Sequence, residues 1–187
     1  MFKEMNDITV YSSKNRMSDN VFIVFFSLME EAFPSSERRT AQGHRAEFNS
    51  PMFNSICYMP DRIYGFINYW EFEDFVYVEH FAVQPELRGK GIGASLMEEL
   101  RCRVGNKILV LEAEPPQDSD IARRRICFYE RLGFMLNPYE YIQPAMSKGE
   151  QPIPLVIMSS PKALTEKEYS TIRDTIYLYV YSPAYFF

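Results

Sequence analysis

The sequence predicts one α/β domain over residues 1–187, built on a mixed, mostly antiparallel central sheet flanked by helices. Three β-like runs separated by short turns predict an antiparallel meander. The last of these runs is followed by a glycine-rich loop, an amphipathic helix and another apolar run, a unit that joins two parallel strands by a right-handed crossover. The chain is 47% apolar and 24% charged and shows no internal repeat, which fits a single compact core.

The N-terminal part predicts one strand and two helices. A short β-like run spans residues 7–12. Ser18 is suited to be the N-cap of an apolar helix that Pro34 ends. A more polar helix is expected over residues 35–42, capped by its opening serines, with Gly43 as its stop.

The middle of the chain predicts the meander and the crossover. The three β-like runs span residues 55–59, 63–69 and 75–83. Apolar side chains then recur every four residues on one face of a helix that Gly105 closes: Ile92, Leu96, Leu100 and Val104. The next strand is expected over residues 107–113, where the run ILVL indicates burial.

A further helix and two β-like segments follow. The helix is expected over residues 120–132, since Ser119 is a good N-cap and Gly133 a good C-terminal stop. The β-like segments are expected at residues 139–143 and 155–159.

The last helix has the clearest start signal. Thr165 and Glu168 have the spacing of a capping box, in which each side chain bonds the backbone N–H of the other residue. We expect this helix to run to about residue 179 and the aromatic end of the chain to pack on the domain.

Composition argues against several classes of protein. No apolar run approaches the roughly 20 residues that cross a bilayer, so no membrane insertion is expected. The first ten residues lack the apolar segment of a secretion signal, which favours a cytoplasmic location. The net charge of −5 and the short, interrupted basic stretches argue against nucleic acid as a partner.

Cysteine and histidine are too scattered to indicate a metal site. Cys57, Cys102 and Cys127 are odd in number and lack CxxC spacing, so we interpret them as buried thiols. His44 and His80 lie far apart and without cysteine pairs nearby. No metal is therefore expected.

The loop before the central helix predicts an anion site. Gly89, Gly91 and Gly93 leave the backbone without side chains, so successive N–H groups can close around a diphosphate at the helix N-terminus. Arg88 and Lys90 add positive charge. A tight turn without a ligand is the simpler interpretation, but three glycines beside two cations favour the anion cradle.

Other phosphate-binding loops fit this segment less well. A P-loop would need glycine where Gln84 stands and a hydroxyl where Gly91 stands. The dinucleotide fingerprint GxGxxG/A does match Gly89, Gly91 and Ala94, with Glu112 as a candidate ribose-binding acid. Against it, five residues separate the strand from the first glycine, and no second βαβ unit follows.

Two motifs in order resemble the GNAT superfamily of acyl-CoA-dependent N-acetyltransferases. RGKGIG, residues 88–93, matches its RxxGxG loop, and CFYERLGF, residues 127–134, matches the signature at the end of its fourth helix. The similarity covers most of the chain and is sharpest over residues 75–134. It implies a GNAT-like mixed sheet in which the fourth and fifth strands run parallel and splay apart.

The resemblance also implies an activity. Such a protein moves an acetyl group from acetyl-CoA to a primary amine by direct attack in a ternary complex. The acceptor, a small-molecule amine or a protein amino group, is not readable from the sequence, and a monomer or a homodimer is equally compatible. A non-catalytic acyl-CoA-binding regulatory module is the alternative.

The cofactor contacts that the resemblance implies lie on the fourth strand and the loop after it. The pantetheine arm would pair with the strand edge and the diphosphate would lie on the loop amides, at Phe81, Ala82, Val83, Arg88, Gly89, Lys90, Gly91, Ile92, Gly93 and Ala94. Ala122 stands where the family often has an asparagine. Arg123, Arg124 or Arg125 could compensate by reaching CoA phosphates, although a solvated arginine run is the more ordinary interpretation.

Proton transfer needs a base for the ammonium of the acceptor. Glu79 is the expected base, since strand alternation places it with Tyr77 and Phe81 on one face and His80 on the other. A carboxylate with an ordinary pKa is a weak base, so Glu79 would need a raised pKa or a water relay. His80 is the second candidate.

The departing thiolate needs an acid. Tyr129 occupies the position of the general acid in the family motif, and a phenol with a pKa near 10 can donate to a thiolate within hydrogen-bond reach. Phe128 and Phe134 are expected to pack rather than react.

Overall fold

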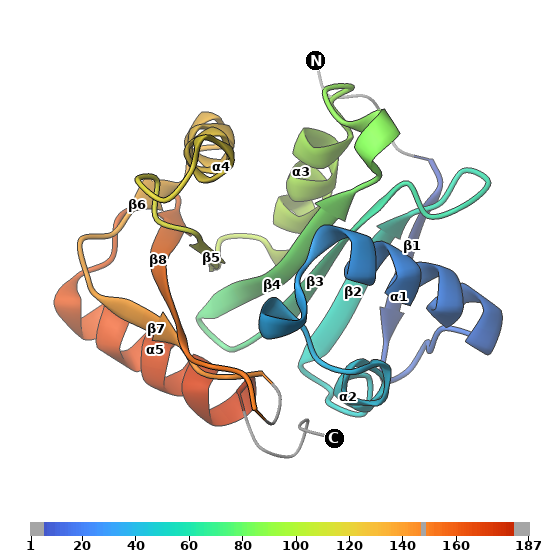
Figure 1. Cartoon of the computed structure of the whole chain (residues 1–187), viewed down its shortest axis with the longest axis horizontal. Helices are drawn as coiled ribbons and strands as arrows, with labels where there is room; N and C mark the ends of the chain where they lie inside the picture. Colours follow the sequence, from blue (N-terminus) through green and yellow to red (C-terminus); the bar gives the residue numbers. More distant parts are fainter. Residues whose placement is uncertain (1–5, 147–148, 182–187) are drawn as a thin grey trace.

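The computed structural model describes residues 6–146 and 149–181 and arranges their strands in one mixed sheet (Figure 1). The strands follow the order β1-β2-β3-β4-β5-β8-β6, and β7 pairs with β8 outside this path. Their bounds are β1 Ile8–Ser12, β2 Phe53–Tyr58, β3 Gly65–Glu71, β4 Phe75–Val83, β5 Ile108–Ala113, β6 Met135–Leu136, β7 Tyr141–Gln143 and β8 Ile153–Ser160.

The pairing confirms the mixed sheet that the sequence predicts. Strands β1 to β4 are antiparallel neighbours, and β5 pairs antiparallel with β8. Between them, β4 and β5 run parallel, but only from Phe75 opposite Ile108 to Val78 opposite Leu111. Beyond these residues the two strands have no register and part.

A β-bulge interrupts β4 at Glu79. Asn68 is opposite His80 and Tyr69 is opposite Val78, so Glu79 is the extra residue. The simple alternation expected for this strand is therefore wrong. Glu79 and His80 both turn to the face that carries Tyr77, whereas Phe81 packs with the opposite core cluster.

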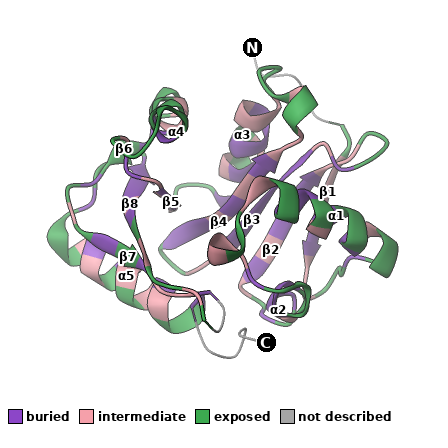
Figure 2. Ribbon diagram, in the orientation of Figure 1, coloured by how far each residue is buried: buried purple, intermediate pink, exposed green. Residues whose placement is uncertain are grey.

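Helices cover both faces of the sheet, as Figures 1 and 2 show. One core cluster lies under α1 and α5, and the other lies under α3 and α4. Their bounds are α1 Asp19–Ala32, α2 Ala41–Glu47, α3 Ile92–Val104, α4 Asp120–Arg131 and α5 Glu166–Tyr179, with short 3-10 turns η1 at Ser35–Glu37 and η2 at Pro85–Leu87.

The capping residues explain where the helices begin. Ser18, Ser119 and Thr165 each accept a backbone N–H of the first turn, as the sequence predicts. The helix expected to stop at Gly43 is a correction. Thr40 accepts the N–H of Gly43, so α2 begins at Ala41 and Gly43 lies inside it.

Three smaller features of the fold also differ from the sequence analysis or extend it. Cys57 is buried, but Cys102 and Cys127 are exposed because they lie on the outer faces of α3 and α4. The two-residue strand β6 was too short to give a sequence signal. Packing of the aromatic end is seen for Val180 and Tyr181, while residues 182–187 and the first five residues lie outside the described part. No helix in the described part is long and apolar enough to span a bilayer.

The capping box of α5 yields a stability prediction. Replacement of Thr165 by Ala removes the bond to the Glu168 N–H and should lower the free energy of unfolding by about 1 kcal/mol. Urea unfolding measures this change in the free energy of unfolding. Thr171→Ala, at an exposed position of the same helix, is the control and should change stability by less than about 0.5 kcal/mol.

Candidate active site

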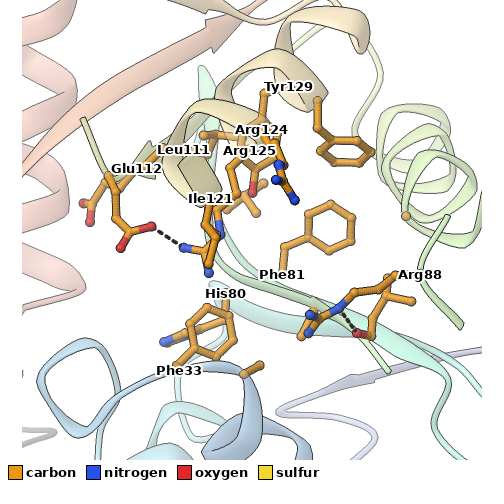
Figure 3. A pocket seen from close by; sticks show the side chains of 18 of the residues that line it. Phe33, His80, Phe81, Arg88, Leu111, Glu112, Ile121, Arg124, Arg125 and Tyr129 are labelled. Carbon is orange, nitrogen blue, oxygen red and sulfur yellow. Dashed lines mark hydrogen bonds and ion pairs between the residues drawn. The ribbon is translucent and has the colours of Figure 1, made fainter. Parts of the chain in front are cut away.

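A cavity of about 800 Å³ opens where β4 and β5 part. Its wall is built from the second half of β4, the end of β5, the start of α3, one face of α4 and the segment around η1. Figure 3 shows how Phe81, Arg88, Glu112 and Tyr129 surround it from these different elements. The cavity therefore brings together segments that are distant in the sequence.

The edge of β4 offers backbone hydrogen-bonding groups to this cavity. The Gln84 N–H donates to the Tyr64 carbonyl across 2.9 Å, which sets the alternation of the antiparallel ladder with β3. By that alternation the N–H and C=O of Phe81 and Val83 face away from β3, while those of Ala82 face toward it. An extended ligand can therefore pair with the N–H and C=O of Phe81 and with the N–H of Val83, whose carbonyl accepts from Arg88.

The glycine loop forms an N-terminal cradle on α3. Gly89 and Gly91 have φ values of 76° and 84°, a conformation that favours glycine. Gly91 is the N-cap and supplies no side-chain acceptor, so the N–H groups of Ile92, Gly93 and Ala94 keep the free donors of a helix start. The loop has the donors and the helix dipole that an anion requires.

Gly93 serves a different purpose from the other two glycines. A Cβ there would approach Phe81 Cζ at 3.1 Å and Phe128 Cζ at 3.3 Å. Its missing side chain lets α3 pack closely against the two rings that border the cavity.

The cationic side chains divide into those that reach the cavity and those that do not. Arg88 lines it and donates from Nε to the Val83 carbonyl at 3.1 Å, while Lys90 is exposed and does not line it. Arg124 and Arg125 also line the cavity, and Arg125 pairs with Glu114 at 2.7 Å.

The remaining arginine of the α4 run does not reach the cavity. Arg123 pairs with Asp120 at 2.7 Å on the exposed side of the helix. Ala122, at the position for which the resemblance implies an asparagine, is fully buried. Three arginines of α4 line the cavity and could contact an anion there, Arg124, Arg125 and Arg131.

Tyr129 lies on α4 and lines the cavity beside Phe128. Burial raises the pKa of its hydroxyl to about 12, against a smaller opposing effect of Arg125. The phenol is therefore protonated at neutral pH and able to donate.

Glu79 lies in a buried ionic cluster. Its carboxylate pairs with Arg39 and accepts the Trp70 Nε1–H at 2.7 Å, and Arg39 also contacts Glu47 at 2.7 Å. Burial alone would raise the pKa of Glu79, but the charge of Arg39 and the Trp70 hydrogen bond hold it well below its usual range. This environment is unfavourable for the expected role as a direct proton acceptor.

His80 is neutral in its environment. Burial lowers its pKa to about 4, and Nε2 lies 2.9 Å from the Glu37 carbonyl, which can only accept. The proton of the ring is therefore on Nε2, and Nδ1 carries the lone pair. Within the described residues Nδ1 has no hydrogen-bond partner.

Glu112 is the site residue that sequence reasoning missed. It lines the cavity at the end of β5, one residue beyond the last parallel pair with β4. Burial raises the pKa of its carboxyl to about 7, although hydrogen bonds from Tyr141, Tyr181 and Tyr77 oppose the rise. The sequence indicates it only as a candidate ribose-binding acid, and its three tyrosine partners come from separate elements, so no local pattern predicts its role.

Comparisons with known proteins agree with this geometry. Residues 53–136 match the family model described as "Acetyltransferase (GNAT) domain". A solved structure described as "Putative acetyltransferase from GNAT family" from Bacteroides thetaiotaomicron is 33% identical, covers 93% of this chain and 97% of its own, and superposes with a TM-score of 0.81. "Putative acetyltransferase YjbC" of Bacillus subtilis (strain 168) is 25% identical over 146 residues, 77% of this chain and 74% of its own.

A more distant structure contains the expected kind of ligand. An aminoglycoside 6'-N-acetyltransferase complexed with coenzyme A is 14% identical, covers 82% of this chain and 95% of its own, and has a TM-score of 0.61. At this identity the likeness concerns the fold alone.

Proposed function

The chain belongs to the GNAT acetyltransferase superfamily, and from that premise we propose that it transfers an acetyl group from acetyl-CoA to a primary amine by direct attack in a ternary complex. One observation carries the proposal. A single cavity combines an anion cradle, an unpaired strand edge, a protonated phenol and a carboxyl group that titrates near neutral pH.

The residues present fit CoA. The free amides of Ile92, Gly93 and Ala94 and the Arg88 side chain suit the diphosphate, and the Phe81 backbone and the Val83 N–H suit the amides of the pantetheine arm. Acetyl-CoA, when bound, supplies the activated thioester. Arg124 is placed to meet a further phosphate from α4.

Proton transfer is assigned to Glu112 and Tyr129. A general base works best with a pKa near the working pH, which favours Glu112 at about 7 over Glu79 in its pair with Arg39. Glu112 accepts the proton of the acceptor ammonium. The freed amine would then attack the thioester carbonyl, and Tyr129 would donate its proton to the sulfur as the C–S bond breaks. The second proton that the nitrogen loses would restore the phenol.

The acceptor side of the cavity favours a cationic amine. Phe33, Glu37 and Glu114 line it. Burial and the nearby charge of Glu114 raise the pKa of Glu37 and Arg125 opposes this rise, so the two carboxyl groups lie within electrostatic reach of each other. A small-molecule amine or a protein amino group would satisfy this surface.

CoA binding and transfer test the proposal directly. Calorimetry should detect CoA binding at micromolar concentrations, with NAD⁺ as the diphosphate control that binds far more weakly. Free-thiol release over a panel of primary amines should then find a substrate. Binding of CoA without transfer to any amine would favour a regulatory module, and failure to bind CoA would refute the proposal.

Replacement of Tyr129 by Phe removes the proton donor and leaves the ring. The expected result is a kcat lower by about 100-fold or more with CoA affinity unchanged. Tyr139→Phe is the control, because that hydroxyl donates to the Leu164 carbonyl away from the cavity. Equal activity of both variants would make Tyr129 structural.

Replacement of Glu112 by Gln tests the base. The wild-type kcat/KM should rise with pH through about 7 as the carboxyl loses its proton, and Glu112→Gln should lose this rise and most of the activity. Glu99→Gln on α3, where Glu99 pairs with Arg103, should behave as wild type. A retained rise in the Gln variant would assign the titration to another group.

A further inference from the structure

The two residues that follow α5 are buried against the candidate site. Val180 is 0% exposed and Tyr181 is 5% exposed, although both lie beyond the last residue of the helix. Their neighbours Leu178 and Tyr179 are exposed. Val180 and Tyr181 are therefore held by contacts that their neighbours on α5 do not make.

Tyr181 is a partner of the carboxyl group assigned as the base. Its hydroxyl donates to Glu112 Oε2 at 2.8 Å and lies 3.1 Å from the Tyr77 hydroxyl. Tyr141 donates to the other oxygen, Oε1. Both oxygens of Glu112 therefore have a phenol donor, and each donor stabilises the ionised form.

Arg39 anchors the segment that carries Tyr181. Its Nη2 donates to the Val180 carbonyl at 2.5 Å, and its Nη1 pairs with Glu47 and Glu79. The guanidinium is fully buried, so this tie is shielded from water. It joins the end of α5 to α2 and to the bulge of β4.

We propose that Tyr181 is a positioning residue of the transfer reaction, whose hydroxyl orients the Glu112 carboxyl and favours its proton-accepting state. The role rests on the proposed function, because it acts through Glu112. Val180 and Tyr181, the two described residues after α5, are then part of the active site.

The groups that face Glu112 determine how its titration should change when one of them is replaced. They are Tyr77 and the charge of Glu79 from β4, Tyr141 from β7, and Tyr181 from the segment after α5. Tyr177 on α5 donates instead to the Ile142 carbonyl at 2.5 Å. It is a matched control, being a tyrosine of the same region whose hydroxyl does not bond Glu112.

The experiment measures the titration of Glu112 by two independent readouts. Carboxyl ¹³C NMR follows the side chain directly, with the signal assigned by its loss in Glu112→Gln, and the pH profile of kcat/KM follows its effect on transfer. In Tyr181→Phe the loss of a donor to the carboxylate should move both midpoints upward by about one pH unit. Transfer should be weaker at pH 7 and recover at higher pH, because the base must be deprotonated.

The controls separate positioning from a merely structural role. Tyr177→Phe should leave both midpoints unchanged, and Tyr141→Phe should raise them, which keeps the test open should Tyr181→Phe fold poorly. A rate that falls equally at every pH with an unmoved NMR midpoint would overturn the proposal. Because the NMR midpoint needs no turnover, a missing transferase activity would be distinguished from a failure of the Tyr181–Glu112 coupling.

Discussion

The end of the parallel pairing between β4 and β5 is the constraint on which the site depends. Backbone groups inside a sheet are satisfied by the neighbouring strand, so a ligand can pair with a strand only where that neighbour is lost. Here the pairing stops at Val78 and Leu111, and the next groups of β4 face a cavity. The bulge at Glu79 adds a second constraint, since it turns both Glu79 and His80 to the face of the sheet that carries Tyr77.

Two carboxyl groups near this separation have opposite electrostatic environments. Glu79 is buried beside a guanidinium and stays ionised, whereas Glu112 is buried among neutral phenols and titrates near neutral pH. The difference between the two pKa values comes from the partners of each carboxyl group, because burial raises both pKa values. Arg39 and Tyr181 supply these partners, and the Val180 carbonyl links them. The packing of Val180 and Tyr181 therefore affects the environments of both carboxyl groups.

Local patterns in the sequence determined the main elements and the glycine loop that opens α3. Caps such as Ser119 and Thr165 act within one helical turn, and Gly89 and Gly91 act within one loop, so their effects are readable from neighbouring residues. The strand, loop, helix and strand around that loop also predicted the parallel pair and the family to which the chain belongs. The start of α2 was missed, because the cap that operates is Thr40 rather than an earlier serine.

Only the tertiary structure decided the protonation chemistry of the site. A bulge depends on how two strands pair, so the alternation expected for β4 failed at Glu79. The pKa of a carboxyl depends on burial and on charges that arrive from elsewhere in the chain. Glu79 pairs with Arg39, 40 residues earlier in the chain, and Glu112 accepts a hydrogen bond from Tyr181, 69 residues later. Periodicity and motif spacing describe short-range order, whereas these contacts exist only because the sheet brings α2, β4, β5 and the end of α5 together.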